Sequence, residues 1–359
     1  MLMKLNLLAA RILCALFTAF ISLSASAVAS HYSFEQNGFY YYINSTPNKT
    51  LSITFSGDGA SSSDADPKLF NTPDIYKGEI SIPSKVTYNG ITYTVNEINE
   101  QAFAGSSYLT SVIIPESVTV IGHSAFRYCT SLTKVTIPKS VTRIDSYAFQ
   151  NCTELESISL PEKVTYLGFA CFYNCINLAT LIIPDGVTLI NNLFCNGCTN
   201  LKSVTLPSSL TSIGRWSFMG CSSLKSIEIP QGVTSIGSSA FNGCRALELI
   251  TINAIEPPTA VEIPEGQISG GTFDTWHYEN TDLRVPAESI EKYKNAPVWE
   301  NFFKDRNPLT GIEGVEAAEG AESEVVARYD LSGRPVADDY RGMTIVRRAD
   351  GSTAKEILR

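Results

Sequence analysis

The middle of the chain repeats itself every 23 residues. Seven leucines keep this spacing, and six prolines and six cysteines keep it with them. The leucines are Leu109, Leu132, Leu155, Leu178, Leu201, Leu224 and Leu247; the prolines are Pro115, Pro138, Pro161, Pro184, Pro207 and Pro230; the cysteines are Cys129, Cys152, Cys175, Cys198, Cys221 and Cys244. A fixed period of about 20 to 50 residues is the signature of stacked repeats. We therefore predict a solenoid, an architecture that commonly serves as an extended recognition surface.

Each repeat contains the signals for two short extended segments. Residues 135–137 alternate apolar and polar, which predicts a strand, and Pro138 ends it because proline has no N–H for a ladder. Residues 141–144 form the second extended segment. The next column is Gly122, Asp145, Gly168, Asn191, Gly214 and Gly237. These residue types tolerate a positive φ, so we predict a left-handed turn at this column in every coil.

A threonine follows each repeat proline by four positions. The column is Thr119, Thr142, Thr165, Thr188, Thr211 and Thr234. An array of hydroxyls for a ligand is one interpretation. We favour the other, an inward or edge-on ladder of β-branched side chains that hydrogen-bond between coils.

The repeat pattern LxxIxIPxxVTxIGxxAFxxCxx resembles the BspA-like class of leucine-rich repeat, which occurs on many bacterial surface proteins. The resemblance covers roughly residues 78–252. It implies a mainly β leucine-rich repeat solenoid with short turns, in which coils of 23 residues stack into a right-handed superhelix with capped ends. The first repeat begins near residue 82 and carries a nine-residue insertion, because Pro83 and Phe103 lie 20 positions apart against 11 for Pro115 and Phe126. That insertion also resembles the opening repeat of the family.

The N-terminal residues of the chain predict export. Residues 1–29 combine Lys4 and Arg11 with an apolar run and the sequence Ala25-Ser26-Ala27, which predicts a secretory signal peptide cut after Ala27 or Ala29. No later stretch approaches the length of a membrane-spanning helix, so we expect no membrane insertion after signal removal. The formal net charge is −9 with no basic stripe, which argues against nucleic acid and anionic membranes as partners.

Four further segments surround the repeats. Residues 30–77 predict an N-terminal β cap with paired strands, and residues 253–310 a C-terminal cap with a strand at Leu283–Val285 and a short helix from Ala287. Residues 311–325 predict an acidic, solvated linker. Residues 326–359 alternate like three or four short strands and resemble the C-terminal sorting tails of Bacteroidetes secreted proteins. This second resemblance implies delivery to the outer surface.

Eight cysteines remain after signal removal, and two interpretations compete. Export favours disulfides, but equivalent residues on stacked coils lie about 4.8 Å apart, wider than the Cβ separation of about 3.8 Å in a disulfide. We favour buried free thiols that pack as small apolar side chains. The pair Cys195 and Cys198 forms a C-x-x-C, yet Cys198 belongs to the ladder, and Phe194 and Cys195 have exchanged the usual Ala-Phe order. We predict no metal and no cofactor.

No motif for hydrolysis or phosphate binding is present, so we predict no enzyme activity. A carbohydrate-cleaving solenoid is the enzyme alternative, because it needs paired carboxylates over a groove. Glu154 and Glu156 lie near each other in sequence, but at a loop and strand start where acids commonly face water.

Binding to a macromolecule is therefore the predicted function, and large side chains near the middle coils are the candidate site. Arg and aromatic residues supply binding hot spots when they are exposed. The candidates are Arg143, Tyr147, Tyr166, Phe169, Leu189, Arg215 and Trp216; the alternative is that several are half-buried packing between coils. By resemblance, host extracellular-matrix proteins or other cell-surface macromolecules are the expected partners. A surface carbohydrate-binding or carbohydrate-degrading protein, and a passive envelope component, are the other two hypotheses.

Overall fold

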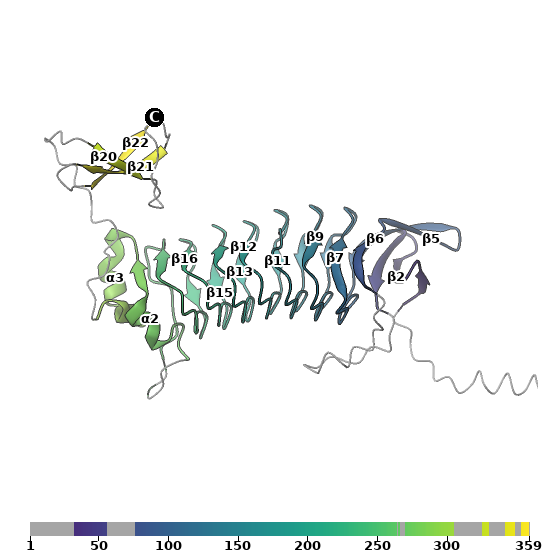
Figure 1. Cartoon of the computed structure of the whole chain (residues 1–359), viewed down its shortest axis with the longest axis horizontal. Helices are drawn as coiled ribbons and strands as arrows, with labels where there is room; N and C mark the ends of the chain where they lie inside the picture. The colour runs from purple at the N-terminus through teal and green to yellow at the C-terminus, as the bar shows by residue number, and fades with distance from the viewer. Residues whose placement is uncertain are drawn as a thin grey trace, which may run out of the picture.

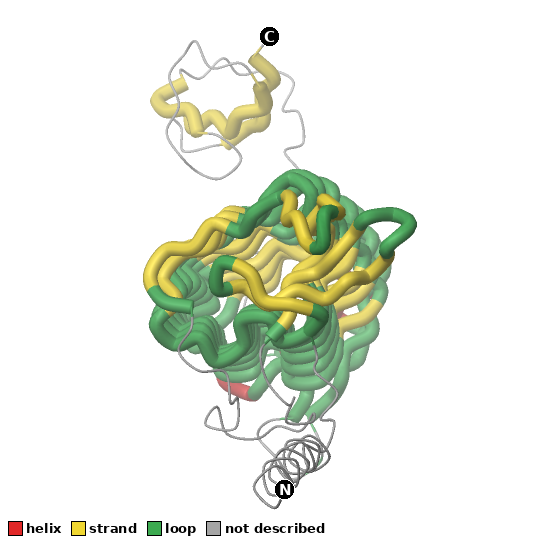
Figure 2. The backbone as a smooth tube through the Cα atoms, turned by 90° about the vertical axis from the view of Figure 1, so that its right-hand side faces the viewer, coloured by secondary structure: helices red, strands yellow, loops and turns green. Residues whose placement is uncertain are grey.

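A computed structural model describes residues 32–55, 76–263, 265, 270–304 and three strands between 325 and 358. The predicted signal peptide and almost all of the predicted acidic linker lie outside these residues. The repeats form an elongated solenoid whose coils stand side by side along the long axis (Figure 1). Viewed down that axis, successive coils lie one behind another in register (Figure 2).

Two sides of the solenoid are built from parallel strands. The first-strand side holds the strand that begins each repeat: β4 (Gly78–Ser81), β7 (Leu109–Ile113), β9 (Lys134–Thr136), β12 (Thr180–Ile182), β14 (Ser203–Thr205), β16 (Ser226–Ile229), β18 (Leu249–Ile252) and β19 (Asp282–Arg284). The second-strand side follows the proline: β6 (Ile91–Ile98), β8 (Val120–Ile121), β10 (Arg143–Ile144), β11 (Tyr166–Leu167), β13 (Leu189–Ile190), β15 (Ser212–Ile213) and β17 (Ser235–Ile236). From β7 to β18 the paired residues are 23 apart, as Arg143 and Tyr166 are. This confirms that the sequence period is the coil length.

The predicted left-handed turn is real but lies at another column. Positive φ angles occur two positions later, at Ser124, Tyr147, Ala170, Leu193, Trp216 and Ser239, and again at Tyr128, Asn151, Asn174, Gly197, Gly220 and Gly243. The prediction at the column of Gly122 was therefore wrong. The left-handed residues direct their N–H groups along the solenoid: Tyr147 N donates to Phe169 O at 2.8 Å and Asn151 N to Tyr173 O at 2.8 Å. These turns form the third side of each coil.

The glycines at the column of Gly122 are explained by close backbone approach rather than by a positive φ. A Cβ added at Gly168 would lie 2.2 Å from the Ser146 nitrogen, and one at Gly237 would lie 2.5 Å from the Arg215 nitrogen. Glycine is present because the backbone of the preceding coil approaches too closely for a side chain. Small residues at a repeated position thus mark close approach here rather than backbone conformation.

Aromatic rings stack along the interior. Phe103, Phe126, Phe149 and Phe172 lie face to face, with ring centroids 5.1–5.6 Å apart and interplanar angles of 2–5°. Phe194 breaks the pattern because it occupies the position before the usual one. Its ring stands at 85° to Phe172 and 81° to Phe218, and the parallel arrangement resumes at Phe218 and Phe241. The predicted exchange of Phe194 and Cys195 is confirmed, and both side chains are fully buried.

A ladder of thiols runs beside the rings. All eight cysteines of the described chain are buried and free. Each ladder Sγ donates to a carbonyl 26 residues earlier, as Cys152 does to Phe126 O at 3.1 Å. Burial raises the pKa of the thiols of Cys129, Cys152, Cys175, Cys221 and Cys244, for Cys244 to about 12, so these groups stay protonated and unreactive at neutral pH.

The threonine column forms the predicted ladder but does not point inward. Thr211 Oγ1 donates to Thr188 O at 2.9 Å, and Thr234 Oγ1 to Thr211 O at 3.3 Å. The side chains themselves are exposed. Since their hydroxyls are engaged with the backbone of the preceding coil, the ladder stabilises the stacking of coils rather than presenting free donors.

The N-terminal end is closed by continuing the sheet. β1 (Phe34–Gln36), β2 (Phe39–Ser45) and β3 (Thr50–Thr54) are antiparallel, and β3 pairs in parallel with β6. The insertion in the first repeat is a hairpin of β5 (Lys85–Tyr88) with β6. Its two-residue turn, Asn89-Gly90, has φ angles of 49° and 75°, the positive values that such hairpins require.

The C-terminal end is closed by helices. After Phe273, which stacks on Phe241 at 5.5 Å, come α2 (Thr275–Asn280), β19, η2 (Ala287–Ser289), α3 (Ile290–Lys294) and η3 (Trp299–Phe302). The predicted strand at Leu283–Val285 is present as β19, one residue earlier, and the helix begins at Ala287 as predicted. Phe241 and Phe273 lie 32 positions apart, so the last coil also carries nine extra residues.

The remaining described residues form an antiparallel sheet of β20 (Val325–Tyr329), β21 (Gly342–Arg348) and β22 (Thr353–Leu358). These strands lie in the segment for which three or four short strands were predicted. Within the described part of the chain, no helix has the length and apolar character needed to span a bilayer.

Candidate functional site

The predicted site residues separate into two groups. The first, which we call the middle surface, comprises Arg143, Tyr147, Tyr166, Phe169 and Leu189. Arg143 is its charged member: the guanidinium carbon lies 4.2 Å from the centre of the Tyr166 ring, and Nε lies 2.6 Å from Asp145 Oδ1. The cation is thus neutralised within its own coil. Asp145 also acts on Glu97, whose pKa is raised mainly by burial and further by this neighbouring carboxylate.

The aromatic members of the middle surface pack edge to face across coils. The Tyr147 ring lies 5.2 Å from Phe169 at 71° and 5.3 Å from His123 at 79°. Arg127, which is almost fully buried, stacks on the Tyr147 ring at 5.3 Å. Tyr147, Phe169 and Tyr166 are half-buried, so the packing interpretation and the surface interpretation both apply to them. Leu189 is more open, with 42 % of its surface exposed.

The second group is Arg215 and Trp216. The Arg215 guanidinium lies 4.0 Å from the Trp216 ring centre, and its backbone N–H donates to Asn192 Oδ1 at 2.8 Å. Trp216 is a left-handed residue of the third side, like Tyr147 three coils earlier. Leu189 of the middle surface pairs with Ser212 in the coil that carries Arg215 and Trp216, so the two groups meet at neighbouring coils.

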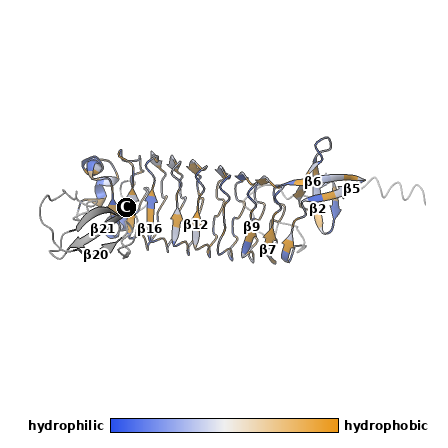
Figure 3. Ribbon diagram, turned by 90° about the horizontal axis from the view of Figure 1, so that it is seen from above, coloured by the Kyte–Doolittle hydropathy of each residue, from blue (hydrophilic) through white to orange (hydrophobic). Residues whose placement is uncertain are grey.

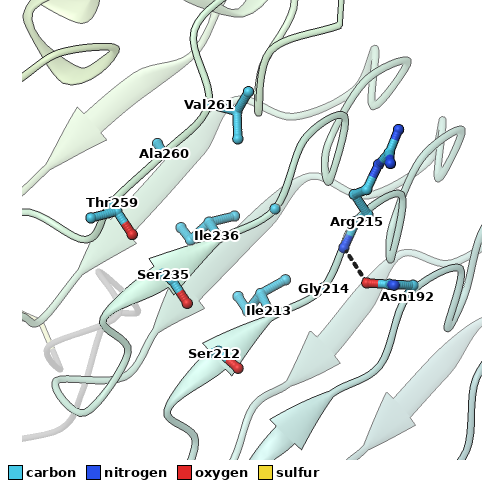
Figure 4. A pocket seen from close by; sticks show the side chains of 11 residues that line it. Asn192, Ser212, Ile213, Gly214, Arg215, Ser235, Ile236, Thr259, Ala260 and Val261 are labelled. Atoms are coloured by element: carbon cyan, nitrogen blue, oxygen red, sulfur yellow. Dashed lines mark hydrogen bonds between the residues drawn. The ribbon is translucent and has the colours of Figure 1, made fainter.

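Arg215 borders a hollow of about 400 Å³ at the C-terminal end of the second-strand side. We call it the Arg215 hollow, lined by Asn192, Ser212, Arg215, Ser235, Thr259 and Val261 among others. In Figure 4, Val261 and Arg215 stand on opposite sides, with Ile213 and Ile236 on the floor between them. It exists because the last coil departs from the 23-residue register: Ser235 pairs with Thr259, 24 positions later.

The first-strand side is a flat polar face with isolated apolar groups. Figure 3 shows hydrophobic segments recurring along its labelled strands, and Ile182 is the most exposed large apolar residue, at 70 %. A hollow of about 620 Å³ lies at its C-terminal end, beside Thr205, Glu228 and Asn253. Asn253 Nδ2 donates to Glu228 Oε1 at 2.7 Å, which engages the one carboxylate that lines it.

The residues weighed for catalysis and metal binding are placed in structural roles. Glu154 is exposed and accepts a hydrogen bond from Asn177 Nδ2 in the next coil at 3.2 Å. Cys195 and Cys198 are buried in the thiol ladder. Across the described residues, no group of three or more His, Cys, Asp or Glu side chains is arranged to hold a metal ion.

Sequence reasoning missed several residues that border these surfaces. His123 and Arg127 contact Tyr147. His123 shares the column of Phe169 and Arg215, which was the signal that could have found it, whereas the column of Arg127 gave none. Val261 and Thr259 were missed because they follow the last regular repeat. The detectable signal there was the loss of the 23-residue spacing after Leu247.

Comparison with known proteins places these features in a family. The profile of the BspA type leucine rich repeat region matches in six copies over residues 81–196 and 189–257. No curated protein matches the sequence significantly. A leucine rich cell surface protein from Faecalibacterium prausnitzii is 30 % identical, with 72 % of this chain and 71 % of that chain covered and a TM-score of 0.53.

Two further solved structures are similar over much of their length. The leucine rich repeat protein of T. pallidum is 26 % identical, over 60 % of this chain and 90 % of that chain, with a TM-score of 0.48. A leucine-rich repeat protein from Bacteroides ovatus is 22 % identical, over 71 % of each chain, with a TM-score of 0.39.

Proposed function

Because the chain belongs to the family of BspA-type leucine-rich repeat proteins, we propose that it is an exported, non-enzymatic scaffold that binds a protein at the cell surface. Export is supported by the signal-like sequence of residues 1–29. Surface display is supported by the similar protein from Faecalibacterium prausnitzii, which is described as a cell surface protein. The partner we propose is a host extracellular-matrix protein or another cell-surface macromolecule.

The observation that carries this proposal is the composition of the middle surface. Tyr147, Tyr166 and Phe169 are held by ring and cation contacts, so their side chains are already ordered before a partner arrives. An ordered aromatic group loses little conformational entropy on binding, which is why such residues dominate protein interfaces. Leu189 adds exposed apolar area beside them.

The electrostatics of the middle surface suit a protein partner more than a polyanion. Arg143 is paired with Asp145 at 2.6 Å, so its charge is largely compensated. A guanidinium stacked on an aromatic ring still offers donors at its edge, a geometry suited to protein carboxylates and carbonyls. Net charge −9 adds long-range repulsion toward polyanions.

The test is a binding screen of the purified chain against immobilised matrix proteins and neutral polysaccharides. The variant Arg143→Ala/Tyr166→Ala/Phe169→Ala truncates the middle surface without touching the left-handed residue Tyr147. We expect binding to one protein ligand, weakened at least about tenfold in this variant, because each hot-spot truncation costs on the order of 1–2 kcal/mol.

The control truncates three exposed residues on the first-strand side, Lys134→Ala/Thr136→Ala/Ser157→Ala. It should bind like the unmodified chain. Binding that survives in the middle-surface variant, or that falls equally in both variants, contradicts the assignment of this surface. Binding to polysaccharide alone replaces the protein-binding function with the carbohydrate hypothesis.

A further inference from the structure

Two of the arginines that stack on aromatic rings, Arg143 and Arg215, differ in one respect. Arg143 lies over Tyr166 at 4.2 Å and Arg215 over Trp216 at 4.0 Å, so their ring contacts are alike. Arg143 also has a carboxylate partner, Asp145, at 2.6 Å. No ion pair joins Arg215 to any residue in the described part of the chain, and its side chain is exposed. Arg215 is therefore an uncompensated cation at the rim of a hollow in an acidic protein.

The floor of the Arg215 hollow presents hydroxyl groups. Ser212 and Ser235 are paired residues on β15 and β17. Thr259 is paired with Ser235, but its hydroxyl already donates to Thr234 O at 3.1 Å, so the two serines are the hydroxyls that we consider. Ile213 and Ile236, the next residues along each strand, are buried, so the two serines face outward by strand alternation. Hydroxyls on neighbouring parallel strands lie about 4.8 Å apart, a spacing comparable to that of hydroxyls across a sugar ring.

The backbone around this floor is already engaged. Ile236 N donates to Thr259 O at 2.8 Å, and Thr259 N donates to Thr234 O at 2.9 Å. A peptide therefore cannot bind here by adding a strand, which is how extended peptides usually gain affinity on a sheet. A ligand must be held by side chains: a guanidinium, hydroxyls, the Asn192 amide and an apolar wall at Val261, which is 42 % exposed.

We propose that the Arg215 hollow binds a sugar ring that carries a carboxylate. The guanidinium would hold the carboxylate in a bidentate pair, the geometry that arginine favours. Ser212 and Ser235 would hydrogen-bond the ring hydroxyls, and Val261 would pack on the apolar face of the ring. The volume of about 400 Å³ lies within the range of small-ligand sites. Glu262 follows Val261 but does not line the hollow.

The Arg215 hollow shares no lining residue with the middle surface, although Ser212 pairs with Leu189 on the adjacent coil. The test variants change only the hollow, so the failure of one proposal leaves the other standing. The experiment titrates the purified chain with trigalacturonate by calorimetry, alongside the same trimer with its carboxyls reduced to alcohols. The test variants are Arg215→Gln, which removes the charge, and Ser235→Leu, which fills the hollow and keeps the charge. The control is Lys225→Gln, which removes the charge of an exposed cation in the same coil outside the hollow.

We expect trigalacturonate to bind and the reduced trimer to bind at least about tenfold more weakly. Arg215→Gln and Ser235→Leu should each weaken trigalacturonate binding at least about tenfold, because a hydrogen bond to a charged group contributes roughly this much. Lys225→Gln should stay within about twofold of the unmodified chain. The proposal is overturned by any of four results. These are no binding at millimolar sugar, equal binding of the reduced trimer, equal loss in Lys225→Gln, or an aspartate-rich peptide of equal charge that binds as tightly with the same dependence on Arg215.

Discussion

Two neighbouring coils, residues 161–183 and residues 184–206, contain the same buried pair of side chains in opposite order. The first has Cys171-Phe172 and the second has Phe194-Cys195. Phe172 lies at 5° to the Phe149 ring, whereas Phe194 stands at 85° to Phe172. All four side chains are nevertheless fully buried. The interior of this solenoid therefore constrains the volume in each layer more strictly than the position of the ring.

The same two coils differ on the second-strand side. Gly168 donates its backbone N–H to Ile144 O at 2.9 Å, as the residues of its column do in most coils. Asn191 occupies that column in the next coil and uses its side chain instead, with Nδ2 donating to Leu167 O at 2.7 Å. β11 and β13 are not paired as a result, and the second-strand sheet is divided there.

The largest expected effect separates the two ring orientations. Phe172→Ala and Phe194→Ala should each lower the free energy of unfolding by about 3–5 kcal/mol, as truncation of a buried Phe usually does. The loss should be greater for Phe172, because its ring neighbours lie at 5.6 and 5.4 Å, against 5.4 and 6.5 Å for Phe194. Urea denaturation of both variants measures the difference. Equal losses would show that ring geometry contributes nothing beyond volume.

A second comparison concerns the glycine column. Gly168→Ala should destabilise the fold by about 1–3 kcal/mol, because the new Cβ would meet the Ser146 nitrogen at 2.2 Å and backbone must move. Asn191→Ala introduces no Cβ that is not already accommodated. It removes only the hydrogen bond to Leu167 O and should cost about 1 kcal/mol. The order of the two losses in thermal or urea denaturation is the readout, and the reverse order would contradict the close-approach explanation.

The thiols of the two coils should behave alike. Burial raises the pKa of Cys171 and Cys195 in the folded state, so the unfolded chain releases these protons first as pH rises. The stability from each thiol is complete below the unfolded pKa of about 8.5 and is lost progressively above it, by about 1.4 kcal/mol per pH unit. Cys171→Val and Cys195→Val should each reduce the alkaline slope of the unfolding free energy by that amount. An unchanged slope in either variant means that this thiol ionises in the fold.

The smallest expected effect comes from restoring the common order. Phe194→Cys/Cys195→Phe conserves volume and should change the unfolding free energy by less than about 1 kcal/mol. The single variant Phe194→Cys leaves the layer underfilled and should be clearly less stable than the double variant. A crystal structure of the double variant should show the ring at residue 195 parallel to Phe172 and Phe218. A large loss of stability would show that the surrounding side chains are fitted to the exchanged order.

The sequence predicted most of the fold because each coil repeats the same contacts. The period predicted the strands, the buried thiols and the exchange at Phe194, since these depend only on apolar identity at fixed spacing. The period could not distinguish between the two physical reasons for a repeated glycine. A positive φ and a close approach of neighbouring backbone both favour glycine at a position. The residue types at Tyr147, Leu193 and Trp216 do not indicate the left-handed backbone that these residues adopt. These residues are held there by hydrogen bonds to the next coil rather than by intrinsic preference.

The candidate site was less predictable for a related reason. The sequence identified Arg143, Tyr166 and Arg215 as unusual members of their columns, but distance along the solenoid axis separates the first two from the third. The Arg215 hollow depends on Val261, which stands where earlier coils have Gly237 and Gly214 and where the register is lost. The 23-residue period predicts the contacts between regular coils. It carries no information about the positions at which the spacing is lost.

The divided second-strand sheet has a mechanical consequence. Between the coils of residues 161–183 and 184–206, the first-strand side remains paired through β12 and β14, and the third side through Phe172 N and Phe194 O at 2.9 Å. Only the side with Tyr166 and Leu189 lacks a ladder. A solenoid whose adjacent coils are hydrogen-bonded on two sides and lack strand pairing on the third bends more easily by opening that third side. Flexing at this seam would change the separation of Tyr166 and Leu189, so a force along the solenoid would act directly on the middle surface.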